Sequence, residues 1–445
     1  MNTPICDFVR AYASLDPVRL HMPGHKGKPL LGPEALDITE IPGADVLYQS
    51  SGVIRESEEN AARLFGSART VYSTEGSSLC IRAMLYLAQM YARLTGRNLR
   101  IAAGRNAHKV FLEAAALLDL ELSWLSSDAS LYSCEVNLPA LEALLADPAK
   151  APAAVYLTSP DYLGSCLDLA PIAELCRRHG VLLLVDNAHG AYLKFLSPSR
   201  HPLDLGADLC CDSAHKTLPV LTGGAYLHFS QSCPRSLIPM AERAMALFAS
   251  TSPSYLILQS LDAVNPRLAD DYPRRLAETL GRMDELKAAL VRDGWRLYGN
   301  EPLKLTLLPK NRGYRGDELA ALLERDGIFC EFADPDHLVL MISPETDERE
   351  LHALLKALQS VPKRQPVSEL PPSLPHPEQV LSPRDAMLCP WETVPIEESL
   401  GRVLASPSVS CPPAIPILIC GERIDEDALR MFRYYGIESC DVVIE

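Results

Sequence analysis

Between about residues 51 and 270, the chain alternates segments of helical length with short apolar runs. Residues 77–94 have the length of a helix. The runs that have the length and composition of buried strands are residues 153–157, 181–185 and 225–229. Such alternation is typical of an α/β domain, in which helices flank a mostly parallel sheet. We therefore expect this fold, with ligands gathered at the carboxyl ends of the strands.

The chain has 445 residues. A single hydrophobic core is usually smaller than this, so we expect several domains. We expect an N-terminal arm, a large domain, a small α/β domain, a proline-rich linker and a C-terminal α+β domain. Their expected bounds are residues 1–50, 51–270, 271–360, 361–377 and 378–445, in that order.

The composition argues against several classes of protein. A formal net charge of −15 and a pI of about 5.3 disfavour binding to nucleic acid or to anionic membranes. The thirteen cysteines include no CxxC pair, so we expect reduced, buried thiols rather than a disulfide framework or a zinc site. The N-terminus lacks a basic-then-apolar signal, and no apolar run reaches the roughly 18 residues of a membrane span. We therefore expect a cytoplasmic protein.

His21 and His25 have the spacing of two metal ligands on one face of a helix. Pro23 and Gly24 lie between them and prevent a regular helical turn, so we expect no metal here. A structural loop and a loop that approaches an anionic ligand both remain open.

Two charged residues follow predicted strands in the large domain. Asp186 comes directly after the run 181–185, and a carboxylate buried there needs a cationic partner. Lys216 lies in a semi-apolar loop, where burial would keep its amine partly neutral and able to condense with a carbonyl group. A lysine that merely covers a solvated surface is the alternative.

Two further features open helices. Residues 74–78 combine hydroxyls, a glycine and free backbone N–H groups at the start of the helix 77–94, which suits a phosphate group. A plain N-cap by serine is the alternative. His108 precedes another apolar helix, where it could contact a ligand or simply cap or pack the helix.

Together these four features match the needs of pyridoxal phosphate (PLP). Its phosphate binds at a helix N-terminus, its ring nitrogen needs a carboxylate, its ring needs a flat partner and its aldehyde needs a lysine. Each feature is weak alone. Their order on one α/β frame predicts PLP as the cofactor.

Longer motifs resemble those of the ornithine/lysine/arginine decarboxylases, in the short form without an N-terminal receiver-like domain. The resemblance spans nearly the whole chain and implies the fold-type I architecture of PLP enzymes, as in aspartate aminotransferase. The motifs that carry it are His21–Gly27, Asn106 with His108 and Lys109, Ser159–Pro160 with Tyr162 and Gly164, Asp186 with Ala188–Gly190, Ser213 with His215–Leu218, Ser250–Tyr255, Ser382–Ala386 and Gly421–Ile424.

The resemblance implies a role for each matching residue. Lys216 would hold the cofactor covalently, and His215 would touch the phosphate or return a proton. Asp186 would pair with the ring nitrogen, and His108 would stack on the ring. The other contacts implied are those of Gly76, Ser77, Ser78 and Ser213 with the phosphate, of His189 near the ring hydroxyl, and of Ser250 and Thr251 with the phosphate of a neighbouring subunit in at least a homodimer.

The implied reaction is decarboxylation of arginine or lysine, with ornithine less favoured, to carbon dioxide and the amine of polyamine synthesis. Another reaction on the same fold, such as transamination or a lyase step, is one alternative. A PLP-binding regulatory protein without catalysis is another. Candidate partners for the cationic end of the substrate, each of which could instead be a solvated surface acid, are Asp161, Glu331, Asp334, Asp336 and Glu422.

Several positions depart from the pattern of the family. They are Glu75, Asn187, Tyr192, Gly223, Cys411, Ala414 and Cys420. None of them removes a predicted cofactor residue. They bear on the choice of substrate, because the last domain helps to shape the substrate channel in this family.

Overall fold

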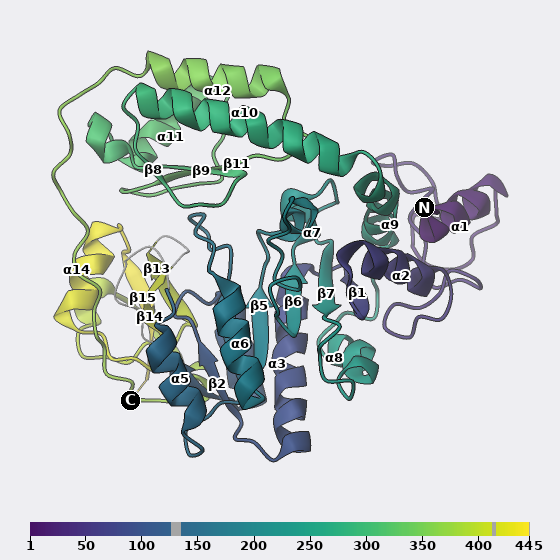
Figure 1. Ribbon diagram of the computed structural model, residues 1–445, viewed down its shortest axis with the longest axis horizontal. Coiled ribbons are helices and arrows are strands. Elements are labelled where there is room, and N and C mark those ends of the chain that lie inside the picture. The colour runs from purple at the N-terminus through teal and green to yellow at the C-terminus, as the bar shows by residue number, and fades with distance from the viewer. Residues whose placement is uncertain (126–134, 412–414, 445) are drawn as a thin grey trace. The chain divides into compact units, whose positions relative to one another are not determined.

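The computed structural model describes residues 1–125, 135–411 and 415–444 (Figure 1). The chain forms two compact units. The first comprises residues 1–99, 145–159 and 168–275, and the second comprises residues 100–144, 160–167 and 276–445. The division into five domains expected from the sequence remains a prediction.

The first unit is built on a sheet whose strands run in the order β1-β7-β6-β5-β4. Their bounds are Arg69–Ser73 (β1), Ala154–Thr158 (β4), Leu182–Asp186 (β5), Leu209–Asp212 (β6) and Ala225–Phe229 (β7). β4, β5 and β6 are parallel, whereas β7 is antiparallel to both β6 and β1. The predicted mostly parallel sheet is thus confirmed, and three of its strands lie within one residue of their predicted bounds.

The strands of this sheet are buried over nearly their whole length, which explains their continuous apolar sequences. The first unit also contains the helices α1 (Pro4–Ser14), α2 (Val53–Phe65), α3 (Gly76–Thr95), α6 (Leu169–His179), α7 (Ala214–Thr217), α8 (Ala241–Ala246) and α9 (Tyr255–Ala269). Helix α6 ends at Gly180, whose φ of 62° is left-handed, and the chain then enters β5.

The second unit contains the parallel pair β2 (Arg100–Ala103) and β3 (Glu121–Trp124), with the helices α4 (Lys109–Leu118) and α5 (Leu138–Ala146). Its four-stranded sheet has the order β10-β11-β9-β8, with bounds Phe332–Ala333, Leu338–Met341, Lys304–Leu307 and Leu297–Tyr298. Helices α10 (Tyr272–Arg292) and α12 (Glu348–Ser360) lie side by side along this sheet, and α11 (Gly316–Arg325) packs on β10 and β11 (Figure 1).

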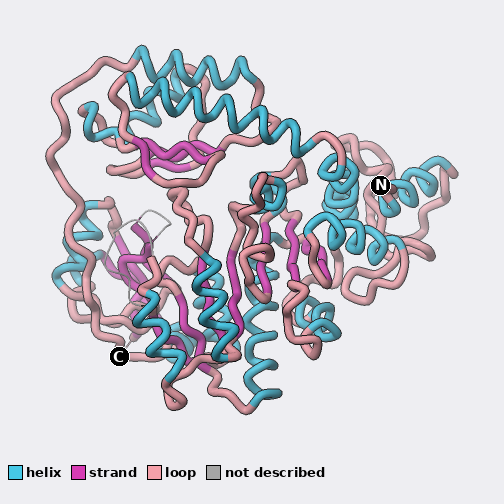
Figure 2. The backbone as a smooth tube through the Cα atoms, viewed as in Figure 1, coloured by secondary structure: helices cyan, strands magenta, loops and turns pink. Residues whose placement is uncertain are grey.

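Residues 361–377 form no helix or strand and run as a long loop (Figure 2), as their proline content predicts. The C-terminal part is α+β, as expected. Its elements are α13 (Pro383–Leu388), β12 (Trp391–Pro395), β13 (Ser408–Cys411), β14 (Ile415–Ile419), α14 (Glu426–Tyr434) and β15 (Ser439–Val443). Its core contains Leu404, Ile417 and Phe432. Ala414, one of the departures from the family pattern, lies outside the described residues.

Over the described ranges, no helix combines the length and the apolar character that a membrane span requires. The eleven described cysteines form no disulfide with one another, and most of them are buried. Residues 21–27 form bends and turns rather than a helix, as Pro23 and Gly24 predict.

Candidate active site

Lys216 lies on the short helix α7, directly after the buried strand β6. Its Nζ atom is 3.1 Å from Nε2 of His189, which follows β5. The expectation that burial surrounds Lys216 is wrong, because the residue is exposed. The apolar residues of the loop, Ala214 and Leu218, point into the core instead and leave the lysine on the outer side.

Asp186 ends β5 and is only 3% exposed. Its carboxylate accepts hydrogen bonds from the Tyr156 hydroxyl at 3.2 Å and from the backbone N–H of Ala188 at 3.2 Å. In the described part of the chain, no lysine, arginine or histidine forms an ion pair with it. A buried carboxylate held by neutral donors alone favours a cationic partner. The protonated ring nitrogen of PLP would be such a partner, so this position fits the predicted cofactor.

The predicted phosphate site is assembled at the N-terminus of the 20-residue helix α3. The Ser213 hydroxyl lies 2.8 Å from that of Ser77, so β6 and α3 bring two predicted phosphate ligands together. The N–H of Gly76 donates to Gly223 O at 2.8 Å, which leaves the next amides of the helix, those of Ser77 and Ser78, for an anion. A Cβ atom on Gly223 would lie 2.8 Å from Thr74 O, so glycine permits this close approach.

The His215 ring has a defined tautomer. Its Nδ1 lies 2.9 Å from Gly224 O and must donate to it, which leaves Nε2 with a free lone pair. Burial lowers the pKa of His215. The hydrogen bond to Gly224 O acts against this shift, and the nearby Lys216 charge adds to it, so the pKa stays below its usual value. His215 is therefore neutral at pH 7 and can accept a proton at Nε2.

Ser250 and Thr251 are both exposed. The backbone N–H of Ser250 donates to the Glu75 carboxylate at 2.9 Å, next to the predicted phosphate site of the same chain. Their contribution to a neighbouring subunit remains a prediction.

A buried polar cluster around Asp212 connects the loops that follow β5 and β6, and the sequence did not indicate it. One oxygen of Asp212 lies 3.0 Å from His201 Nε2 and 3.3 Å from His228 Nε2. The other accepts from the Asn187 side-chain amide at 2.7 Å. All four residues are 0% exposed. Because Asn187 follows Asp186 and Asp212 precedes Ser213, the cluster ties the two predicted cofactor-binding loops together.

Burial would raise the pKa of Asp212, but His201 and His228 outweigh it and hold the pKa of this carboxyl well below its usual range. A depressed carboxyl pKa gives stability that is complete above the unfolded pKa of about 4 and is lost as the pH falls below it. We expect Asp212→Asn to lower the free energy of unfolding by about 2 kcal/mol at pH 7. The difference from wild type should shrink between about pH 5 and pH 2, as followed by thermal unfolding.

Asp208 provides a control whose pKa is shifted in the opposite direction, because burial raises it to about 6. Its ionisation disfavours folding, so Asp208→Asn should gain stability relative to wild type as the pH rises from about 4 to 6. If the stability difference between Asp212→Asn and wild type stayed constant down to pH 2, the stabilising role assigned to the Asp212 charge would be contradicted.

His108 belongs to the second unit, where it is the N-cap of α4. Its Nδ1 accepts a hydrogen bond from the N–H of Val110 at 3.3 Å. The helix-capping alternative is therefore realised. Capping uses one ring nitrogen and fixes the ring plane, which is compatible with a second role for the ring face.

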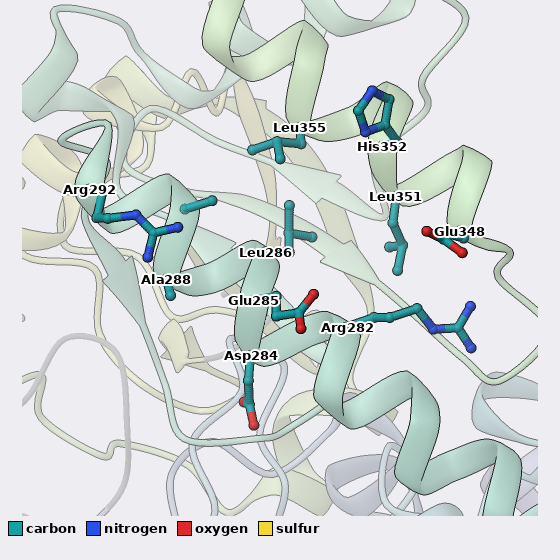
Figure 3. A pocket seen from close by; sticks show the side chains of 11 residues that line it. Arg282, Asp284, Glu285, Leu286, Ala288, Arg292, Glu348, Leu351, His352 and Leu355 are labelled. Carbon is teal, nitrogen blue, oxygen red and sulfur yellow. The ribbon is translucent and has the colours of Figure 1, made fainter.

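A pocket of about 670 Å³ lies between α10 and α12 of the second unit (Figure 3). It is lined by side chains of both charges, among them Arg282, Glu285 and Glu348, together with leucines. None of the predicted site residues lines it. We therefore do not assign this pocket to the candidate active site.

Comparison with known proteins identifies the family of the chain. The model of the Orn/Lys/Arg decarboxylase major domain matches residues 3–306, and that of the family's C-terminal domain matches residues 372–439. The uncharacterized protein YaaO of Bacillus subtilis is 32% identical over 97% of this chain and 93% of its own length. An arginine decarboxylase of Halalkalibacterium halodurans is 30% identical, with the same coverage.

A similar fold occurs in solved structures. The Francisella novicida lysine decarboxylase LdcF superposes with a TM-score of 0.78 at 16% identity, covering 99% of this chain and 81% of that one. The constitutive lysine decarboxylase of Escherichia coli gives a TM-score of 0.74 at 18% identity, covering 100% of this chain and 82% of that one. With both of its family domains matched in order, the chain belongs to the Orn/Lys/Arg decarboxylase family.

Proposed function

We propose that this protein uses PLP to decarboxylate a basic amino acid, arginine or lysine ahead of ornithine. The observation that carries the proposal is the buried Asp186 carboxylate, which has no cationic partner in the described chain and ends the strand next to the one that leads to Lys216. The family match and the arginine and lysine decarboxylases among the relatives support this reaction class.

Each site residue has a task that its environment supports. PLP, when bound, supplies the electron sink for the carbon–carbon bond that breaks. Asp186 would keep the ring nitrogen charged, and Lys216 would hold the cofactor and exchange it for the substrate amine. The neutral His215 would hold or return a proton at Nε2. The hydroxyls of Ser77 and Ser213 and the amide of Ser78 would bind the phosphate, with His108 on the ring face and His189 beside the lysine.

The structure narrows the five acidic candidates for the cationic end of the substrate. Asp161, Asp334, Asp336 and Glu422 are all buried. Three of these four already bind a basic side chain of the chain itself: Asp334 binds His337, Asp336 binds Lys310, and Glu422 binds Arg105. Glu331 alone among the five is exposed, and within the described ranges its carboxylate accepts a neutral hydrogen bond from the Tyr162 hydroxyl at 2.9 Å and forms no ion pair. Because Glu331 is exposed whereas the remaining acid, Asp161, is only 2% exposed, we propose Glu331 as the residue that binds the cationic end of the substrate.

Replacing Glu331 with glutamine should raise KM for arginine or lysine, because the neutral amide cannot form the charge-assisted bond. We expect a loss in kcat/KM of about 10- to 100-fold, with cofactor binding unchanged. Steady-state kinetics on the preferred substrate provides the measurement. Glu324→Gln, an exposed glutamate on α11, is the matched control and should behave as wild type. If the two variants had the same kcat/KM, Glu331 would not bind the substrate.

The active species is proposed to be a homodimer or larger homo-oligomer in the cytoplasm. Large apolar side chains are exposed along residues 15–31, at Leu15, Val18, Leu20, Met22, Leu30 and Leu31. Several large apolar side chains exposed along one stretch are typical of a surface that another protein covers. The exposed Ser250 and Thr251 are available to a second copy, and the free described thiols suit a reducing compartment.

A substrate panel tests the reaction. The purified protein loaded with PLP should release carbon dioxide and the matching amine from arginine or lysine, and less from ornithine. Formation of a keto acid without carbon dioxide would favour transamination. Cofactor binding without turnover of any of the three would favour a regulatory protein.

A further inference from the structure

Two motifs of the C-terminal domain, Ser382–Ala386 and Gly421–Ile424, have no role in the proposed chemistry. Both contact one region of the second unit, namely helix α4 and the loop before it. This helix begins at His108, the residue proposed to stack on the cofactor ring. The contacts therefore bear on how that ring is positioned.

Glu422 binds the loop that leads into α4. Its two carboxylate oxygens accept parallel hydrogen bonds from the Arg105 guanidinium, both at 2.7 Å. Glu422 is 3% exposed, and Oε2 also accepts from the N–H of Ile419 at 2.9 Å. The guanidinium lies 6.0 Å from the centre of the Trp124 ring. The Glu422 carboxylate of this pair is buried, and the Arg105 side chain is 24% exposed. A bidentate pair fixes both distance and orientation, and Arg105 lies three residues before His108.

Arg384 binds the other end of α4. Its Nη1 donates to the carbonyl oxygens of Ala116 at 2.9 Å and Leu117 at 3.3 Å, which are in the last turn of the helix. A cation at this position also interacts favourably with the helix dipole. The short helix α13, which carries Arg384, packs directly against α4.

The Gly421–Ile424 motif is bonded to the two residues that lead into the Ser382–Ala386 motif. Gly421 O accepts hydrogen bonds from the N–H groups of Val380 at 2.8 Å and Leu381 at 3.1 Å. Gly421 has a φ of 85°, and a Cβ atom there would lie 2.1 Å from Leu381 O, so only glycine allows this approach. The contacts to the two ends of α4 therefore come from one connected piece of the C-terminal domain.

We propose that the C-terminal domain holds α4 at both ends, through Glu422 and Arg384, and thereby sets the position of the His108 ring. Glu422, Arg105 and Arg384 are then positioning residues. The inference rests on the proposed function insofar as His108 contacts the cofactor. On this proposal the C-terminal domain contributes to cofactor binding indirectly, by positioning His108, rather than by contacting PLP itself.

The test compares Glu422→Gln with and without His108→Ala, in the full chain titrated with PLP. Glu422→Gln keeps the side-chain volume but weakens the bidentate pair. We expect it to raise the dissociation constant of PLP about five- to tenfold and to lower the visible circular dichroism of the bound cofactor. Glu426→Gln, an exposed glutamate of α14, is the matched control and should change neither.

In the His108→Ala background, Glu422→Gln should cause no further loss of affinity, because the ring that it positions is gone. Additive losses would overturn the proposal, since the pair would then act on PLP by another route. Arg384→Gln should show the same pattern with a smaller loss, and it remains informative if Glu422→Gln unfolds. If His108→Ala binds PLP as wild type does, the assigned role of His108 fails. If His108→Ala binds PLP weakly while Glu422→Gln and Arg384→Gln bind it normally, His108 keeps its proposed role and only the positioning role of the C-terminal domain fails.

Discussion

Lys216→Ala should lower the rate of carbon dioxide release by roughly a thousandfold or more, because it removes the amine that we propose to hold the cofactor and to exchange it for the substrate amine. The structure supports this position, since Lys216 follows β6 and its Nζ lies 3.1 Å from His189 Nε2. The variant should fold normally, because the side chain is exposed. The rate is measured by trapping carbon dioxide from carboxyl-labelled substrate, beside thermal unfolding of the same preparation.

The matched control is Lys356→Ala, which removes an exposed lysine on α12 of the second unit. It should retain wild-type activity. If Lys216→Ala retained more than a tenth of the wild-type rate with PLP still covalently bound, another lysine would have to hold the cofactor.

Asp186→Asn should reduce activity by roughly 100-fold or more while leaving the protein without cofactor as stable as wild type, or more so. The amide matches the carboxylate in size. Its oxygen can still accept from the Ala188 N–H, and its NH2 group can donate to the Tyr156 hydroxyl, which reverses its role. It cannot keep a ring nitrogen charged. It also removes a buried negative charge for which the described chain supplies no cation. The free energy needed to bury this side chain on folding is therefore lower in the variant.

Two measurements on this variant separate the functional from the structural role. Thermal unfolding is compared without PLP, and activity is compared at saturating PLP. A merely structural carboxylate would give an unstable apo-protein and normal activity once folded. That outcome would contradict the assignment of Asp186 to the ring nitrogen.

The main sheet and the residues at its strand ends could be predicted because both follow from local sequence. Continuous apolar runs such as 181–185 indicate buried parallel strands, and the carboxyl ends of parallel strands share one edge of a sheet. Asp186 and Lys216 were found on this basis. The fold class and the family are confirmed by the comparisons, whereas the individual roles of the site residues remain predictions.

Long-range partners could not be predicted. His201 and His228 approach Asp212 from separate segments, and nothing in the local sequence of either indicates a buried carboxylate between them. The sequence makes Glu422 a candidate substrate ligand, because its partner Arg105 is more than 300 residues away and cannot be recognised locally. The exposure of Lys216 was missed for the opposite reason, since an apolar loop can bury its small residues and still turn its lysine outward.

The central claim is that Lys216 holds PLP in a decarboxylase active site, and the most direct test is to locate the cofactor on the chain. The purified protein is loaded with PLP, treated with borohydride to make the attachment permanent, digested and mapped by mass spectrometry. We predict a single modified peptide that contains Lys216 and carries one reduced pyridoxyl phosphate group. Modification of a different lysine, or no modification of protein that has bound PLP, would contradict the claim.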